Sequence, residues 1–310
     1  MNEHSNILKF ASRSEFARAV SEVERLSPEG IKLLSRAPMI EPRIIGWTGA
    51  PGAGKSSLIS AIVRQRRESF PDMRIGIVAV DPSSYRTGGA VLGDRIRMEE
   101  LALDENVFIR SVASKKISGG LSPSVLRISR FLTACGFDEV HIETVGAGQN
   151  DVSISEIADT TIVVSTPNTG DSIQALKAGM MEIADIHCVN KSDLGAADRT
   201  ASALQLTLPD KTCGWSPKII SVSARNGEGI YDLSKLIDEH ENYIESSDSR
   251  KNHFSRRRRF EFEETVRYEL NSRIKNSSAY QESLKSVEEN SENPALSAEK
   301  LLHSFFNNTF

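Results

Sequence analysis

A glycine-rich string near residue 50 has the residue types and spacing needed to hold a phosphate group. It matches the pattern GxxxxGK followed by Ser or Thr, and its members, with the residue after them, are Gly49, Ala50, Pro51, Gly52, Ala53, Gly54, Lys55, Ser56 and Ser57. The glycines let main-chain amides wrap an anion, the Lys55 ammonium can reach the β and γ phosphates, and the Ser56 hydroxyl can ligate magnesium. An apolar run over 44–48 precedes the string and a helical pattern over 57–62 follows it. We interpret the string as a phosphate-binding loop, because a chance match in such a chain is expected on the order of one time in a hundred.

A second polar string directly follows the apolar run 186–189 and consists of Asn190, Lys191, Ser192 and Asp193. The Asp193 carboxylate can accept hydrogen bonds from both N1–H and the exocyclic amine of guanine, whereas adenine presents an acceptor there and leaves a buried acid unpaired. Asn190 would hold the loop, and Lys191 would lie along the base. The backbone amides of Ser223 and Ala224, after a later apolar run, could meet the guanine carbonyl. Asn and Asp are also common turn residues, so this string alone fits a simple loop equally well.

Three acidic residues lie next to predicted strands and could hold a magnesium ion with its waters: Asp81, Asp94 and Glu143. Magnesium prefers a few protein oxygens and keeps much of its hydration shell. Asp81 could equally cap a turn, and Asp94 could be a solvated loop charge. Gly146, three residues after Glu143, would offer its amide to the γ-phosphate, so that hydrolysis releases this segment.

The elements that must position these residues follow an alternating pattern. Short apolar or β-branched runs alternate with helical stretches, at 44–48, 75–80, 107–111, 140–143, 161–165, 186–189 and 219–222. This pattern predicts an α/β fold with a mostly parallel sheet flanked by helices, here around a phosphate-binding loop. Phe16, Val20 and Val23 recur at helical spacing, so we expect an N-terminal helical extension over 1–41, followed by the nucleotide domain over 42–240 and a C-terminal helical segment over 241–310. The polar stretch 276–293 reads as a loop or connector, and Pro294 suits the first turn of a last helix.

Composition excludes several classes of protein. The 310 residues include 38 Lys and Arg against 42 Asp and Glu, a net charge of −4, which removes the simplest argument for nucleic-acid binding. The basic run 256–259 is followed by Glu261, Glu263 and Glu264 and therefore predicts a solvated, ion-paired helix face. No signal peptide or apolar run of membrane-spanning length is found, so we expect a cytoplasmic protein without a membrane partner. The cysteines at 135, 188 and 213 are far apart and are expected to be buried thiols. Trp47, His141 and His187 lie in predicted strands and are expected to be packed in the core.

Several longer strings are similar to those of one family, the MeaB, ArgK and MMAA group of P-loop GTPases. They lie at 80–84, 87–89, 92–98, 108–111, 119–121, 143–146 and 179–185. The resemblance implies a GTPase that uses GTP, GDP and Mg²⁺ and acts as a chaperone for an adenosylcobalamin-dependent acyl-CoA mutase such as methylmalonyl-CoA mutase. It also implies a homodimer joined through C-terminal helices, in which nucleotide state gates cobalamin loading and protects the mutase.

The same resemblance assigns roles to individual residues. It places Asp81, Asp94 and Glu143 at the acidic magnesium positions, and it makes the segment 167–177 a switch that meets the mutase and stimulates hydrolysis. Lys177 is the candidate catalytic residue of that switch, beside Lys55 and Glu143. From its sequence context alone, Lys177 is equally well an exposed helix lysine.

Two other functions share some of these motifs. A nickel-insertion GTPase would carry a His-rich tail or a Cys-containing metal site, and the sequence contains neither. A small-molecule kinase would need an ATP site, which the Asp193 argument disfavours. We therefore expect a partner-regulated GTPase, with the nickel-insertion class as the alternative and the kinase as the less favoured one.

Overall fold

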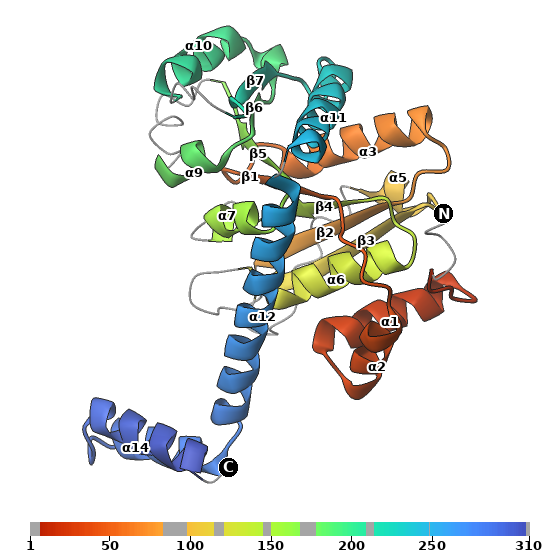
Figure 1. Ribbon diagram of the computed structural model, residues 1–310. Coiled ribbons are helices and arrows are strands. Elements are labelled where there is room, and N and C mark those ends of the chain that lie inside the picture. The colour runs from red at the N-terminus through yellow and green to blue at the C-terminus, as the bar shows by residue number, and fades with distance from the viewer. Residues whose placement is uncertain are drawn as a thin grey trace. The chain divides into compact units, whose positions relative to one another are not determined.

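The computed structural model describes residues 7–82, 98–114, 121–144, 150–167, 178–208, 214–247 and 249–307. Contacts between main-chain positions divide the chain into two compact units, residues 1–260 and 261–310. The first unit contains every strand of the described chain and is shown with its helices in Figure 1. The division into three domains expected from the sequence stays a prediction.

The first unit is built on a seven-stranded sheet in the order β3-β2-β4-β1-β5-β6-β7. The strands are β1 (Ile44–Gly49), β2 (Ile75–Pro82), β3 (Val107–Ser114), β4 (Glu139–Glu143), β5 (Thr160–Ser165), β6 (Ile186–Val189) and β7 (Lys218–Ser221). Every neighbouring pair is parallel. All seven runs predicted as strands are confirmed. Because the strands are parallel, the polar residues that follow β1, β2, β4 and β6 all emerge at one edge of the sheet.

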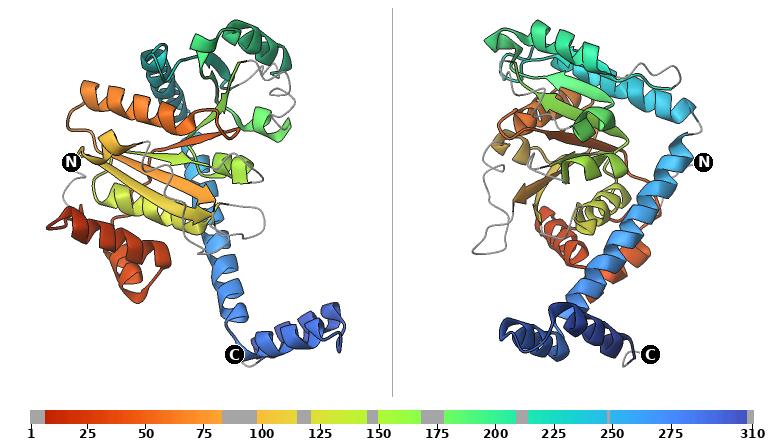
Figure 2. Two further views of the ribbon diagram at one scale, coloured as in Figure 1. Left: turned by 180° about the vertical axis from the view of Figure 1, so that it is seen from behind. Right: turned by 90° about the vertical axis from the view of Figure 1, so that its left-hand side faces the viewer.

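Helices cover both faces of this sheet, as Figures 1 and 2 show: α3 and α11 lie on one face, and α6 with α1 on the other. The helices and short 3₁₀ turns of this unit are α1 (Arg13–Arg25), α2 (Pro28–Arg36), α3 (Lys55–Ser69), α5 (Glu99–Ala102), α6 (Pro123–Ala134), α7 (Asn150–Ser153), η2 (Ile154–Glu156), α9 (Ala178–Ile183), η3 (Ser192–Leu194), α10 (Ala197–Thr207) and α11 (Ile230–Ser246). None of the helices in the described ranges is long and apolar enough to cross a membrane.

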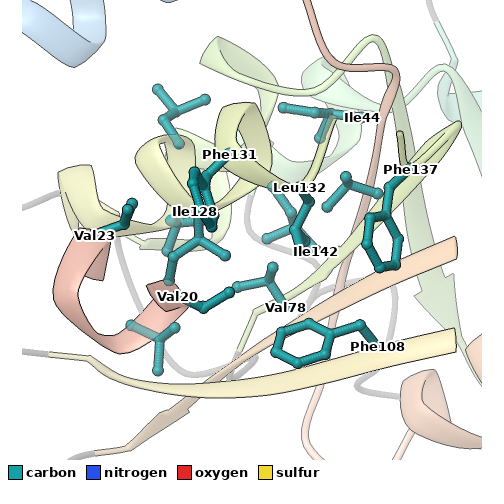
Figure 3. Packing of buried hydrophobic residues seen from close by; sticks show 14 of the residues in the cluster. Val20, Val23, Ile44, Val78, Phe108, Ile128, Phe131, Leu132, Phe137 and Ile142 are labelled. Carbon is teal, nitrogen blue, oxygen red and sulfur yellow. The ribbon is translucent and has the colours of Figure 1, made fainter. Parts of the chain in front are cut away.

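The core on the α1 and α6 face is rich in aromatic rings (Figure 3). Figure 3 shows Phe108, Phe131 and Phe137 in this cluster. Phe16 of α1 lies 4.7 Å from Phe108 of β3 and 5.7 Å from Phe137, measured between ring centroids. Val20 and Val23, one and two turns further along α1, are fully buried in the same cluster. The helical spacing of these three side chains in the sequence is thus confirmed, and it is what fixes the N-terminal extension to the sheet.

The core on the α3 and α11 face contains Trp47 of β1, which is fully buried as expected. Leu58, Ile59 and Ile62 of α3 pack in the same cluster. The thiol Cys188 is buried here and Cys135 is buried on the opposite face, both as expected, while Cys213 lies outside the described residues. Burial raises the pKa of Cys135 to about 12 and that of Cys188 further still, so both are protonated near neutral pH.

The basic run on α12 (Ser249–Lys275) is not a solvated helix face throughout. Arg257 is 1% exposed, with Nη2 donating to Oδ1 of Asp159 at 2.6 Å and Nη1 donating to the carbonyl oxygen of Pro42 at 2.8 Å. Arg258 pairs with Glu41 at 2.8 Å. These partners precede β1 and β5, not the same helix, so the expectation of a solvated face is wrong for Arg257. This buried guanidinium is used within the protein and offers no charge to nucleic acid, and loss of either partner would leave the other buried and unpaired.

The second unit contains the rest of α12, then α13 (Ser278–Glu288) and α14 (Pro294–Asn307). Pro294 occupies the first turn of the last helix, as expected. The loop expected over 276–293 is wrong, because α13 fills much of it. Ser277 caps α13 by accepting a hydrogen bond from the Tyr280 amide at 3.2 Å, and Tyr280, Leu284 and Val287 recur at helical spacing. Because most of this stretch is polar, the helical spacing of these three apolar residues is hard to recognise in the sequence.

Candidate functional site

The loop between β1 and α3 requires glycine at two positions. Gly49 has a φ of 136° and Gly54, the N-terminal cap of α3, has a φ of 90°. A Cβ atom on Gly49 would lie 2.1 Å from the carbonyl oxygen of Val164 on β5, and one on Gly54 would lie 2.4 Å from Nδ2 of Asn190. α3 has no side-chain cap at its N-terminus. The loop thus presents the first main-chain amides of a helix, the arrangement that binds phosphate.

Lys55 begins α3 with its side chain folded back over the loop. Its ammonium donates to the carbonyl oxygen of Gly49 at 2.8 Å and lies 3.3 Å from that of Ala50. The side chain is 6% exposed. A positive charge held at the mouth of an amide-lined loop raises the affinity of that loop for a polyphosphate.

The acidic part of the site is formed where β2 and β4 end. Glu143, the last residue of β4, accepts a hydrogen bond at Oε1 from the Ser56 hydroxyl at 2.8 Å. Asp81 lies two positions beyond Ala79, the β2 residue paired with Glu143. Both carboxylates are buried, with exposures of 2% for Asp81 and 6% for Glu143. The strand order therefore brings two carboxylates and a hydroxyl, all hard oxygen donors, to the start of α3.

This donor set fits Mg²⁺ better than a transition metal. Oxygen ligands suit Mg²⁺, which keeps several of its waters, whereas zinc and nickel sites are built from thiolates and imidazoles. Within the described ranges, no group of three or more His, Cys, Asp and Glu side chains is placed to hold a metal ion. Asp94, expected as a further magnesium ligand, lies outside the described residues, as do Gly146 and Lys177.

Asn190 joins the second polar string to the phosphate-binding loop. Its Nδ2 donates to the carbonyl oxygen of Ala53 at 2.8 Å, and its Oδ1 accepts from the Ala224 amide at 3.1 Å. The neighbouring Lys191 donates from Nζ to the carbonyl oxygen of Gly52 at 2.9 Å. Asn190 is 2% exposed, so this polar side chain is buried with both ends of its amide in use. Three motifs far apart in the sequence thus meet at one place.

Ser223 holds the carboxylate of Asp193. The Ser223 hydroxyl donates to Oδ1 of Asp193 at 2.7 Å and accepts from the Asn226 amide at 3.2 Å. Both backbone amides have partners within the protein, Ser223 donating to the carbonyl oxygen of Glu228 and Ala224 to Oδ1 of Asn190, and their contact with a guanine carbonyl stays a prediction. The contribution of Ser223 that sequence reasoning missed is its hydroxyl, which orients the acid.

Asp193 itself is exposed. The discrimination between guanine and adenine expected from the sequence therefore depends on the bound base covering this carboxylate. With Oδ1 held by Ser223, the orientation of the carboxylate is set before a ligand arrives. Such preorganisation lowers the cost of binding a base that offers two adjacent donors.

Sequence reasoning also missed a buried polar row behind the site. Glu139, His141 and Glu143 alternate along β4, and the first two are fully buried. His141 is packed in the core, as expected: Nδ1 accepts from the Trp47 indole at 3.0 Å, and Nε2 is 2.6 Å from Oε1 of Glu139. Burial alone would raise the pKa of Glu139, but Arg66, His141 and Arg43 together outweigh it and lower that pKa to about 2.

A family model described as methylmalonyl-CoA mutase-associated GTPase MeaB matches residues 16–279. The relative named "Putative GTPase PH0274", from Pyrococcus horikoshii, is 39% identical over 267 residues, which cover 84% of this chain and 82% of that protein. The GTPase ArgK of Escherichia coli is 34% identical over 247 residues, covering 74% and 72%. The mitochondrial methylmalonic aciduria type A homolog of Mus musculus is 37% identical over 196 residues, covering 61% of this chain and 46% of that protein.

Among solved structures, one titled LAO/AO transport system kinase covers 96% of this chain and 99% of its own, with a TM-score of 0.63 and 21% identity. At that identity the likeness supports the fold alone. The family match extends over both the nucleotide motifs and the start of the C-terminal helices. The chain therefore belongs to the MeaB family of methylmalonyl-CoA mutase-associated GTPases and is a GTP hydrolase.

Proposed function

We propose that this GTPase acts as a chaperone and gatekeeper for an adenosylcobalamin-dependent acyl-CoA mutase, such as methylmalonyl-CoA mutase, during cobalamin loading and protection. The observation that carries the proposal is the match over 16–279 to a family whose description couples a GTPase to that mutase. The name of the mouse relative refers to methylmalonic aciduria, and so to the same acyl group as methylmalonyl-CoA. Homodimerisation through the C-terminal segment 241–310 and a cytoplasmic location belong to the same proposal.

The nucleotide site would work by positioning and charge rather than by covalent chemistry. The amides over 49–54 and the Lys55 ammonium bind the phosphates, and Ser57 continues the first turn of α3. Asn190, Lys191 and Asp193 select and hold guanine, with Ser223 and Ala224 supporting them. When bound, Mg²⁺ neutralises charge on the β and γ phosphate oxygens.

The remaining residues would hold magnesium or couple hydrolysis to binding of the mutase. Ser56, Asp81, Asp94 and Glu143 are the proposed magnesium ligands, directly or through water, because the three within the described residues supply only oxygen donors. Gly146 would donate its amide to the γ-phosphate and lose that contact on hydrolysis. Lys177 would be moved by the mutase, so that hydrolysis is slow in the free protein and faster in the complex.

A reconstitution experiment tests this function. The purified full chain is mixed with the methylmalonyl-CoA mutase encoded by the same genome, and GTP hydrolysis is measured with and without the mutase. We expect a stimulation of about tenfold or more, a lowering of the barrier by roughly 1.4 kcal/mol. Lys55→Ala should hydrolyse GTP poorly with or without the mutase, and ATP should be a poor substrate.

The outcomes separate the nucleotide site from the partner. Normal hydrolysis by Lys55→Ala would refute the assignment of the phosphate-binding loop. Intrinsic hydrolysis that the mutase neither binds nor changes would leave the GTPase intact and refute the chaperone role. Recovery of a hydrogenase or urease subunit with the GTP-analogue-bound protein, in place of a mutase, would favour a metal-delivery function instead.

A further inference from the structure

Glu139, His141 and Glu143 line one face of β4, since alternate side chains of a strand point the same way. β4 lies between β1 and β2 inside the sheet, and all five of its residues are buried. A strand in such a place is ordinarily apolar on both faces. Three consecutive polar side chains on one buried face therefore need a physical reason.

These side chains hold the two ends of one helix. Glu143 accepts from Ser56 in the first turn of α3 at 2.8 Å, and Glu139 pairs through Oε2 with Nη1 of Arg66 in the last turn at 3.3 Å. Arg66 is itself 2% exposed and also donates to Oδ1 of Asp238 on α11 at 3.0 Å. One strand thus holds α3 at its phosphate end and at its far end.

His141 links the middle of the row to β1. Because Nδ1 accepts from the Trp47 indole N–H, the ring proton is on Nε2 and is donated to Glu139. Trp47 is paired with Glu143 across the strands, and its carbonyl oxygen accepts from the Thr144 amide at 3.0 Å. The His141 imidazole therefore holds the Trp47 side chain, and Trp47 is the β1 residue paired with Glu143.

We propose that Glu139 and His141 are positioning residues for GTP hydrolysis, which hold α3 at a fixed height on the sheet so that Lys55 and Ser56 face the phosphates and Glu143. Apolar contacts between α3 and the sheet, such as those of Leu58 and Ile62, are non-directional and tolerate small slides. Hydrogen bonds and an ion pair do not, because their strength falls steeply with distance and angle. Misplacement by about 1 Å at a phosphoryl-transfer site costs on the order of a hundredfold in rate.

His141→Leu tests the proposal, with His141→Gln as its rescue variant, since the Gln amide can accept from Trp47 and donate to Glu139. We expect kcat to fall about tenfold or more in His141→Leu, with KM for GTP and the Mg²⁺-free affinity for GDP within about threefold, because the base side is untouched. His141→Gln should recover most of kcat. Calorimetry of GDP binding without Mg²⁺ gives a readout independent of turnover.

His187→Leu is the matched control. His187 is 1% exposed on β6, and its neighbours Ile186 and Cys188 belong to the core under α3, so the His187 side chain lies on the other face. Because His187 is on the opposite face from the β4 row and α3, His187→Leu should leave kcat within about twofold of the wild-type value. Glu139→Gln keeps nearly the same side-chain shape and is the alternative test if His141→Leu does not fold. It should also lower kcat.

The proposal is overturned if the folded variants of the row hydrolyse GTP at the wild-type rate. It is also overturned if His187→Leu loses as much kcat as His141→Leu, or if GDP affinity falls in parallel with kcat. In those cases the row contributes only to stability. Selective loss of kcat in His141→Leu or Glu139→Gln, with the control intact, supports it.

Discussion

At the scale of single residues, the base-reading acid Asp193 is set in place by a side chain that local patterns did not identify. Ser223 holds one carboxylate oxygen, and the carboxylate is exposed until a base covers it. Guanine offers this acid two donors, N1–H and the exocyclic amine. A base with an acceptor in place of that amine would instead match an amide side chain, which offers one acceptor and one donor.

Asp193→Asn should therefore change the preferred base from guanine to xanthine. Xanthine presents a carbonyl where guanine presents the amine, so the Asn amide can pair with both N1–H and that carbonyl. We expect GTP affinity to fall by about tenfold to a hundredfold, since each lost or mismatched bond costs about 1–3 kcal/mol. Titration calorimetry with GDP and xanthosine diphosphate measures the exchange. Equal loss of affinity for both diphosphates would count against Asp193 as the base reader.

At the scale of elements, β4 and α3 act as one unit through the buried pair Glu139 and Arg66. The folded pKa of Glu139, about 2, lies below the ordinary carboxyl value of 4.5. A carboxyl group with a lowered pKa stabilises the fold above its unfolded pKa, and that stabilisation is lost as pH falls through the folded pKa. The relevant window is therefore from about pH 4.5 down to about pH 2.

Glu139→Gln should flatten the acid limb of the stability curve in this window. Wild type is expected to lose on the order of 3 kcal/mol of unfolding free energy there through Glu139, in addition to the loss from other acids. The variant, which cannot ionise, is less stable at neutral pH and converges on wild type at low pH. Urea unfolding followed by circular dichroism at each pH measures both curves. Parallel curves would show that Glu139 is not the group responsible.

At the scale of the whole molecule, the second unit exposes apolar side chains that a folded monomer ordinarily covers. Phe262 on α12 and Leu296 and Phe306 on α14 are all exposed, and few residues of α13 and α14 are buried. An exposed apolar surface of this kind is typical of an association site. It supports the proposed homodimer, which the sequence resemblance also implies.

Phe262→Glu should weaken that dimer. The 34.1 kDa chain is expected to elute at about twice its mass at micromolar concentration, and the variant at the monomer mass, because burying a carboxylate against apolar partners is costly. Size-exclusion chromatography with light scattering measures both. Leu206→Glu, on an exposed position of α10 in the first unit, is the control and should leave the mass unchanged. A monomeric wild type would refute the dimer.

Local features of the sequence were enough to predict the seven strands, the phosphate-binding loop and the helical spacing of α1. A strand's apolar run, a glycine at positive φ and a helix period are properties of neighbouring residues, so no long-range contact is needed to recognise them. Dependence on local pattern also explains why a loop is wrongly predicted over 276–293, where few apolar residues mark the helical spacing of α13.

The tertiary structure alone decided which of these pieces meet. Three hydrogen bonds join residues about a hundred positions apart: Ser56 to Glu143, Asn190 to Ala53, and Arg257 to Asp159. These contacts depend on the order β2-β4-β1-β5-β6 and on which face each helix covers. Hydrophobic periodicity specifies that a side chain is inside, but not its neighbour, because apolar attraction is non-directional and the partners of buried polar groups emerge only once the strands are ordered.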